Sequence, residues 1–314
     1  MADLQALSTL EPAGSESPKA PAPSPLPLAV VRALRPRQWT KNAAVLAPLV
    51  FAHKALEPSL ALRAIVATVA FCLLSSAVYV FNDLADRDHD RLHPTKRFRP
   101  IASGEVGTGL AIGLGLALGA SGLAAFWFLG TPAFFGALGY LGLQVAYTGL
   151  LKRLVILDVI AIGTGFVVRV ATGALAIDVP ISNWLYLCTF LLSLFLGFSK
   201  RRAELALLDK EAASHRANLS ELSLPLLDQL ISVVTASTVV SYALYTMSEE
   251  TVRKFGTDNL KFTIPFVVFG IFRYLYLIYR RNEGGSPEKL LLSDVPLLVD
   301  IALFTAIVGA VLYL

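Results

Sequence analysis

Charged residues are scarce in this chain of 314 residues. Asp, Glu, Lys and Arg make up 16% of the sequence, whereas an ordinary soluble domain carries about 25%. Hydrophobic residues make up 55%, and the mean hydropathy is +0.63. Several apolar runs reach the ~20 residues that a helix needs to cross a bilayer. The composition therefore excludes an ordinary soluble domain and predicts a polytopic membrane protein.

Cysteine is also rare, and the sequence shows no sign of a secretory leader. Cys72 and Cys188 both fall in apolar runs, so we expect small buried side chains there. Residues 1–27 are rich in Ala, Pro, Ser and Glu, and they lack the apolar core and basic start of a signal peptide. We expect a disordered tail over 1–27 and a single transmembrane catalytic domain over 28–314. The formal net charge of +4 reflects loop composition and does not indicate nucleic acid binding.

The apolar runs predict nine membrane spans. They fall at about 40–53, 61–82, 106–129, 132–151, 154–176, 181–199, 228–247, 261–280 and 296–314. The first run is short and is closed by the segment His53–Pro58. The predicted fold class is therefore an all-α polytopic membrane protein with nine transmembrane helices.

Lysine and arginine are divided unevenly between the two sets of loops. If the N-terminus is cytoplasmic, the tail and the loops at 87–99, 152–153, 200–216 and 280–289 lie inside and carry twenty cations, whereas the opposite loops carry five. Cytoplasmic loops are the ones enriched in Lys and Arg. The split predicts a plasma-membrane protein with its N-terminus and polar loops on the cytoplasmic side and its C-terminus on the far side.

An acidic cluster lies between the second and third runs, in the stretch NDLADRDHDRLHPTKRFRPIASG at residues 82–104. Asp83, Asp86 and Asp90 follow an i, i+3, i+7 spacing, which places three carboxylates on one stripe of a helix. Asn82 lies one turn before Asp86 and can join them. Carboxylate and amide oxygens are ligands that Mg²⁺ prefers, and Mg²⁺ commonly bridges protein carboxylates to substrate phosphates. The spacing therefore predicts a Mg²⁺ site at these four residues.

Basic residues follow the acids within the same stretch. Lys96, Arg97 and Arg99 are suited to bind phosphate directly. A solvated charged loop between two membrane helices is the alternative, but the helical register of the acids beside these bases favours a site for a diphosphate.

Cations also gather at the mouth of the first run, in RALRPRQWTKN at Arg32–Asn42. Trp, Lys and Arg are common at membrane interfaces, so an interfacial anchor is one interpretation. A contact between a substrate phosphate and Arg35, Arg37 or Lys41 is the other, and the sequence does not decide between them.

The sequence YTGLLKRLVILD, which begins at Tyr147, joins the fourth and fifth runs. Lys152 can neutralise a phosphate, and Asp158 can help to bind a metal or hold Lys152. The alternative is that Lys152 belongs to the ordinary excess of positive charge on cytoplasmic loops. Arg169 lies deep in the fifth run, on the same helical face as Asp158. An intramembrane arginine usually faces a polar interior, and we favour a packing role over substrate binding.

The sixth run ends in FSKRRAEL. Lys200 and Glu204 are four residues apart and can pair on a helix. Lys200, Arg201 and Arg202 can bind phosphate, although positive-inside residues would look the same.

Together these motifs resemble those of the UbiA superfamily of intramembrane prenyltransferases. The resemblance runs from about Arg32 to the last span. It is strongest in RPRQWTKN and in the stretch at 82–104, and the Tyr147–Lys152 pair and SKRRAEL support it. It implies nine helices with an Asn-Asp-rich motif at the cytoplasmic end of the second.

One departure from the wider superfamily points to a particular branch. Members that ionise prenyl diphosphates usually carry a second acidic pair, DxxxD, whereas here Asp158 is followed four residues later by Ile162. The chain is most similar to the branch that transfers phosphoribosyl groups. By that resemblance the donor is 5-phosphoribosyl 1-diphosphate and the acceptor is a long polyprenyl (decaprenyl) phosphate. The product, polyprenyl-phosphoryl-5-phosphoribose, leads in that branch to the arabinose donor for cell-wall arabinan.

The resemblance also implies roles for the residues named above. Asp83, Asp86 and Asp90 would be catalytic through bound Mg²⁺, with Asn82 as a further ligand. The candidates for binding the two substrates are Arg37, Lys41, Asn42, Lys96, Arg97, Arg99, Tyr147, Lys152, Asp158, Lys200, Arg201 and Glu204. Membrane lipids are the remaining expected partners.

Two other classes of membrane protein are alternatives to a phosphoribosyl transferase. A prenyltransferase that moves a prenyl group from prenyl diphosphate to an aromatic acceptor would need a second metal cluster, and only Asp158 is available for it. A transporter built from inverted repeats often shows matching interrupted segments in its two halves, and no such match is present.

Overall fold

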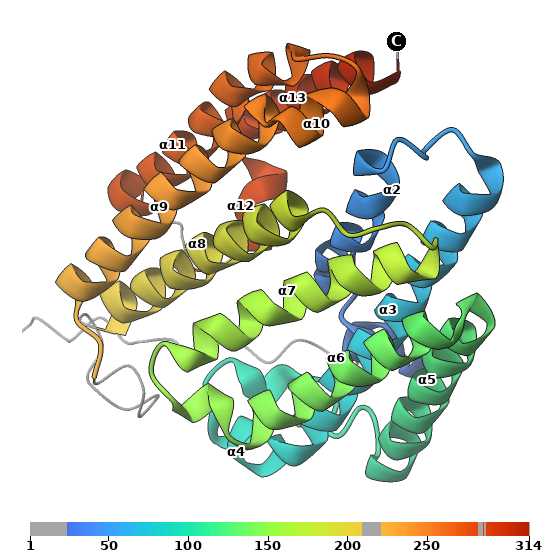
Figure 1. Cartoon of the computed structure of the whole chain (residues 1–314). Coiled ribbons are helices and arrows are strands. Elements are labelled where there is room, and N and C mark those ends of the chain that lie inside the picture. Colours follow the sequence, from blue (N-terminus) through green and yellow to red (C-terminus); the bar gives the residue numbers. More distant parts are fainter. Residues whose placement is uncertain (1–23, 209–220, 282–284, 286, 314) are drawn as a thin grey trace, which may run out of the picture.

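The computed structural model describes residues 24–208, 221–281, 285 and 287–313, and all regular elements within them are helices (Figure 1). Residues 1–23 of the predicted tail at 1–27 and residues 209–216 of the predicted loop at 200–216 lie outside these residues. The first described helix begins at Leu26, two residues before the expected domain boundary.

Eight long helices form the body of the protein. They are α3 (Pro58–Ala85), α5 (Thr108–Leu129), α6 (Thr131–Gly149), α7 (Leu157–Ala176), α8 (Asn183–Leu208), α9 (Leu224–Met247), α11 (Ile264–Arg281) and α13 (Val295–Tyr313). Shorter elements precede and connect them: α1 (Leu26–Leu34), η1 (Pro36–Leu46), α2 (Ala47–Phe51), α4 (Arg87–Leu92), η2 (Lys96–Phe98), η3 (Leu151–Arg153), α10 (Glu249–Phe255), η4 (Asn259–Thr263) and α12 (Pro287–Ser293).

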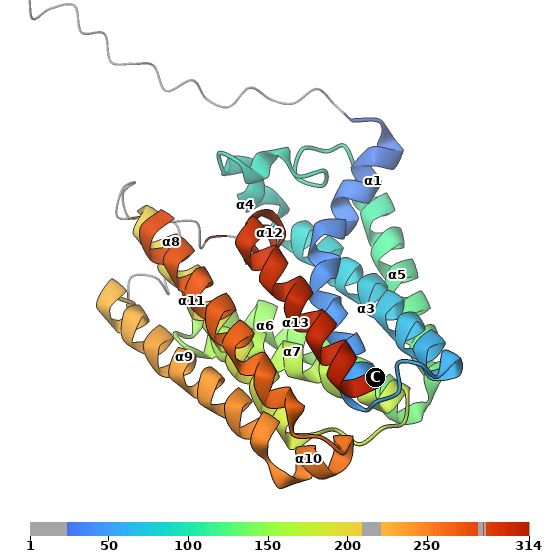
Figure 2. The same ribbon diagram turned by 90° about the horizontal axis from the view of Figure 1, so that it is seen from above.

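The long helices follow one another around the bundle as neighbours. Contacts join α3 to α5, α5 to α6, α6 to α7, α7 to α8 and α8 to α9, and then α9 to α11 and α11 to α13 (Figures 1 and 2). The last described helix then contacts an early segment. The Tyr313 hydroxyl at the end of α13 donates to the Val50 carbonyl oxygen in α2 and accepts from the backbone N–H of Ala55, each at 3.1 Å. These bonds close the ring of helices between its first and last segments.

Six described helices are long and apolar enough to cross a membrane: α3, α5, α7, α9, the continuous segment Asn259–Arg281 and α13. The predicted runs at 132–151 and 181–199 coincide with α6 and α8, which do not join this set. The protein is therefore an all-helical membrane protein, and the count of nine spans stays a prediction.

The first predicted span, at 40–53, does not form a regular membrane helix. Its residues belong to η1, a 3₁₀-helix of 11 residues, and to the 5-residue helix α2. The sequence predicts an apolar helix here, but the segment begins with Thr40, Lys41 and Asn42. Asn42 is fully buried among polar side chains. The hydrogen bonds of these polar groups favour the irregular segment over a smooth apolar helix.

One end of each of the helices α3, α6, α7 and α8 lies at the same end of the bundle, where the polar motifs are found. The Thr148 hydroxyl near the end of α6 donates to Asn82 Oδ1 near the end of α3, at 3.1 Å. Arg201 in the last third of α8 donates to Asp158 at the start of α7, at 2.7 Å. The fold thus gathers segments that lie up to 120 residues apart in the sequence at a single face.

Candidate active site

The spacing predicts one continuous helix for the acidic motif, but the structure divides the motif between two helices. Helix α3 ends at Ala85, Asp86 adopts φ −92° and ψ 4° at its C-cap, and α4 begins at Arg87. The helix is interrupted at Asp86, but backbone bonds from Asp86 N–H to Asn82 O at 2.9 Å and from Asp90 N–H to Asp86 O at 2.8 Å continue across the junction. Asp83 and Asp90 therefore still face the same side. Both carboxylates are buried, with Asp83 3% exposed and Asp90 4% exposed, while Asp86 is half-buried.

Two guanidinium groups neutralise the buried acids. Arg99 Nη1 donates to Asp83 Oδ1 at 3.1 Å and to Asp90 Oδ2 at 2.6 Å. Arg35, which precedes η1, also donates to Asp83 Oδ1. The sequence assigned Arg99 to a substrate phosphate, but in the structure its guanidinium bridges two carboxylates. Because an unpaired carboxylate is costly to bury, these ion pairs explain how both acids can lie inside the protein.

The same geometry tests whether the motif suits a divalent metal. Two carboxylate oxygens converge on one nitrogen atom, so a single cation already bridges Asp83 and Asp90. Oxygen donors are those that Mg²⁺ prefers. Within the described residues no three His, Cys, Asp or Glu side chains lie together as a metal-binding group. The motif therefore fits Mg²⁺ in its donor chemistry, with the position between the carboxylates now taken by Arg99.

The remaining residues of the motif face different neighbours. Asn82, predicted as a further metal ligand, accepts the hydrogen bond from Thr148 on α6. Lys96 is partly exposed in η2, and Arg97 is exposed there with its guanidinium 4.8 Å from the Phe98 ring centre. Lys96 and Arg97 thus remain at the surface of the acidic face, where a soluble phosphate can reach them.

Asp158 forms an ion pair that the sequence analysis did not predict. Its Oδ2 accepts from Arg201 Nε at 2.7 Å, and Arg201 Nη1 also donates to Glu204 Oε2 at 2.6 Å. Asp158 and Arg201 are both buried. α7 and α8 pack so that the forked guanidinium of Arg201 lies between the two acids.

Tyr147 and Lys152 shortly precede Asp158 in the sequence. Tyr147 is in the last turn of α6 and Lys152 is in η3, and both side chains are partly exposed. Lys200, one residue before Arg201, is also partly exposed. These groups border the buried Asp158–Arg201 pair without being sealed in the core.

The N-terminal candidates divide into surface and core residues. Arg37 is exposed, and Lys41 Nζ donates to Gln38 Oε1 at 2.5 Å. Asn42 is fully buried, and its amide bonds to side chains of α3 and α7. Of the three, Asn42 is therefore placed to support the site from within. A signal for this was present in the sequence, because an arginine inside a span needs a polar partner there.

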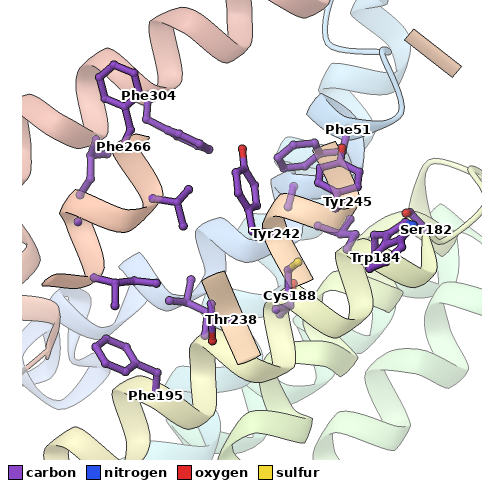
Figure 3. Close-up of a pocket in the computed structure, with 18 of the residues that line it drawn as sticks. Phe51, Ser182, Trp184, Cys188, Phe195, Thr238, Tyr242, Tyr245, Phe266 and Phe304 are labelled. Atoms are coloured by element: carbon purple, nitrogen blue, oxygen red, sulfur yellow. The ribbon is translucent and has the colours of Figure 1, made fainter. Parts of the chain in front are cut away.

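A cavity of about 410 Å³ lies in the other half of the bundle (Figure 3). Its walls come from the early part of α8, the later part of α9, α10, α11 and α13, with α2 at one side. The labelled lining residues are mostly aromatic or apolar, among them Trp184, Tyr242, Tyr245, Phe266 and Phe304. The cavity lies along the early part of α8, whereas Arg201, which contacts Asp158, lies near the other end of that helix. The cavity therefore extends away from the end of the bundle that carries the acidic motif.

Two carboxylate residues, Glu250 and Asp300, line this cavity among the apolar groups. Asp300 on α13 is 8% exposed, and its carboxylate has no hydrogen bond or ion pair with any of the described residues. It packs against Gly270 of α11, where a Cβ atom would lie 2.9 Å from Asp300 Oδ2. The other acid at this helix, Asp294, is bound to Arg273 at 2.8 Å.

Comparisons with known proteins agree on one family. The UbiA prenyltransferase family matches residues 43–293. A protein of Mycolicibacterium smegmatis named decaprenyl-phosphate phosphoribosyltransferase is 34% identical over 94% of this chain and 96% of its own length. A protein of the same name from Corynebacterium glutamicum is 33% identical over 93% of this chain and 90% of its own.

The solved structures agree with the fold. A UbiA homologue from Archaeoglobus fulgidus, bound to GPP and Mg²⁺, superposes with a TM-score of 0.66. The alignment covers 91% of this chain and 100% of that one, at 21% sequence identity.

Asp300 provides a test of the cavity. We predict that Asp300→Leu raises the free energy of unfolding in detergent by about 1–3 kcal/mol, because it removes a buried polar group that has no partner. Asp294→Leu is the matched control and should lower stability, because it leaves Arg273 without its carboxylate. Thermal unfolding monitored by intrinsic fluorescence measures both. A loss of stability in Asp300→Leu as large as in Asp294→Leu would contradict the assignment.

Proposed function

Because the chain belongs to the UbiA prenyltransferase family, we propose that it transfers a phosphoribosyl group from 5-phosphoribosyl 1-diphosphate to a long polyprenyl phosphate. An oxygen of the lipid phosphate attacks the anomeric carbon of the ribose. The bond from that carbon to pyrophosphate breaks, and pyrophosphate leaves with the electron pair. Relatives that carry this activity in their names match over nine-tenths of the chain, which supports the proposal.

The observation that favours this reaction over prenyl transfer is the pairing of Asp158. In place of a second acidic pair, Asp158 forms a buried ion pair with Arg201. Arg201 thus supplies a fixed positive charge between Asp158 and Glu204, at the position where the wider superfamily has its second acidic pair. The site therefore offers one acidic cluster flanked by partly exposed cations, which suits an enzyme that handles several phosphate groups.

We assign Mg²⁺ to the acidic motif, with Asp83 and Asp90 as ligands and Asp86 and Asn82 beside them. When bound, the ion would neutralise charge on the leaving pyrophosphate. Arg99 and Arg35 orient the Asp83 carboxylate, and Arg99 holds Asp90 toward the same point. Arg99 would leave that point for the pyrophosphate oxygens, because a guanidinium binds phosphate as readily as carboxylate.

The remaining cations would hold the phosphate groups of the two substrates. Lys96 and Arg97 lie in the same loop as the acids, whereas Lys152 and Lys200 lie beside the Asp158–Arg201 pair. The lipid phosphate is already an anion at neutral pH, so it needs positioning more than a general base. Part of the lipid tail would occupy the apolar cavity, whose direction away from the acidic motif matches a charged head and an apolar tail.

The orientation in the membrane is part of the proposal. The excess of cations on one set of loops favours nine spans, a cytoplasmic N-terminus and an acidic face that opens to the cytoplasm of a plasma-membrane protein. The soluble donor would then reach the site directly.

A direct assay distinguishes the two transferase classes. We expect purified protein with Mg²⁺ to transfer label from 5-phosphoribosyl 1-diphosphate to polyprenyl phosphate, and to transfer nothing from prenyl diphosphate to an aromatic acid. Product is measured by chromatography of the lipid fraction, with EDTA as the metal control. A labelled prenyl-aromatic product without phosphoribosyl lipid would replace this proposal with the family's other chemistry.

The acidic motif has its own prediction. Asp83→Asn should lower turnover more than 10²-fold, about 2.7 kcal/mol of transition-state stabilisation, because it removes a carboxylate from the metal site. Asp88→Asn is the matched control, since Asp88 is exposed on the same motif and pairs only with Arg87 and Arg91. Steady-state kinetics at saturating Mg²⁺ measure both variants. Near-normal turnover in Asp83→Asn would rule out Asp83 as a ligand.

The orientation is tested separately. His93→Cys should react with a membrane-impermeant maleimide only after cells are opened, and Gly256→Cys should react in intact cells. His93 lies on the acidic face, and Gly256 lies at the other end, after α10. The opposite labelling pattern would place the acidic face outside.

A further inference from the structure

The segment η1 is unusually long for a 3₁₀-helix. It spans 11 residues, from Pro36 to Leu46, whereas runs beyond 3–4 residues are uncommon because their hydrogen-bond geometry is poorer than in an α-helix. Arg35, immediately before it, has φ 53°. A non-glycine residue in that region is strained. Tertiary contacts must therefore hold η1 in place.

One side of η1 is fixed to α3. Trp39 Nε1 donates to Ser76 Oγ at 3.0 Å, and Ser76 Oγ donates to the Leu34 carbonyl oxygen at 2.9 Å. The Arg35 guanidinium lies 5.0 Å from the Tyr79 ring centre and donates to Asp83. The start of η1 is thus bound to the same helix that presents the first catalytic acid.

The other side of η1 is fixed to α7 at two positions one turn apart. Arg169 Nε donates to Asn42 Oδ1 at 3.0 Å. At Gly173 a Cβ atom would lie only 2.4 Å from the Val45 carbonyl oxygen, so the two backbones touch. Asn42 completes the link to α3, because its Nδ2 donates to Ser75 Oγ at 3.1 Å.

Arg169 is fully engaged inside the protein. Its Nη2 donates to the Tyr140 hydroxyl at 2.9 Å and its Nη1 donates to the Gly165 carbonyl oxygen at 3.0 Å. The guanidinium lies 4.7 Å from the Tyr140 ring centre, and the residue is 6% exposed. These bonds involve all three of its guanidinium nitrogens, which supports a packing role for Arg169. Burying a charge at this depth in a span costs free energy, and its bond to Asn42 indicates what role the charge has.

We propose that Arg169 is a positioning residue for the acidic site. Through Asn42 it fixes η1 against α7, and η1 in turn fixes Arg35 on Asp83. Asn42 lies seven residues from Arg35, about 14 Å along a 3₁₀-helix at roughly 2.0 Å per residue. Loss of Arg169 releases η1, and Asp83 then loses one of the two cations that orient its carboxylate. The inference rests on the proposed function only where turnover is measured.

The test combines a structural reporter with kinetics. The chain contains three Trp residues, so protein labelled with fluorotryptophan gives three ¹⁹F signals, and Trp39→Phe identifies the one on η1. In Arg169→Gln we expect the Trp39 signal to move and the other two to stay. Turnover should fall by roughly tenfold or more with the KM of each substrate changed by less than about threefold, because the loss is in transition-state stabilisation. Arg169→Lys should recover part of both effects, since it keeps the charge but not the fork.

Arg63→Gln is the matched control. Arg63 is also an arginine within a span, and it donates to the Ala176 and Leu129 carbonyl oxygens at the other end of α3. It should lower the unfolding temperature without moving the Trp39 signal or changing turnover. This separates positioning from a general effect of removing an intramembrane arginine.

The outcomes are distinct. An unmoved Trp39 signal in Arg169→Gln, or a moved signal with normal turnover, would overturn the proposal. If Arg169→Gln does not fold, the same two readouts on Arg169→Lys and on Asn42→Ser decide it, and unchanged turnover in both would overturn it equally. Wild-type protein that transfers no phosphoribosyl group would instead refute the proposed function, while the ¹⁹F signals would still report whether Arg169 holds η1.

Discussion

The structure of this membrane protein depends on the pairing of buried carboxylates with guanidinium groups at one face of the bundle. Asp83 and Asp90 are almost completely buried, and a buried carboxylate without a partner carries a large desolvation cost. Arg99 and Arg35 offset this cost from two directions. Arg99 comes from the loop after α4, and Arg35 comes from the N-terminal segment. The need to neutralise two acids therefore positions both segments against the end of α3.

A second buried pair organises the neighbouring helix ends in the same way. Arg201 joins Asp158 of α7 to Glu204 of α8. In both places arginine provides the cation, which is consistent with its planar fork and weaker hydration. Other cations of the same motifs are at least partly exposed, among them Lys96, Arg97 and Lys152.

Polar contacts also explain why the bundle is irregular near its N-terminus. Asn42 and Arg169 bond across η1 and α7, and Gly173 lets the two backbones touch. The apolar cavity lies in the other half of the bundle (Figure 3), so the protein combines a charged end with an apolar interior. An amphiphilic acceptor with a phosphate head matches this division, and a soluble diphosphate donor matches the charged end alone.

The sequence by itself determined the all-helical membrane class, the UbiA family and the segments that contain the acids and bases. These follow from local properties: apolar runs of bilayer length, and motifs whose residues are close in the chain. Only the tertiary structure decided the partners. The i, i+3, i+7 spacing of the acids assumed an unbroken helix, but α3 ends at Ala85. Asp158 pairs with Arg201, 43 residues away, and Asn42 pairs with Arg169, 127 residues away. Spacing along one helix cannot predict such pairs, because they depend on how separate helices pack and on which long side chain then lies within bonding distance of the buried polar group.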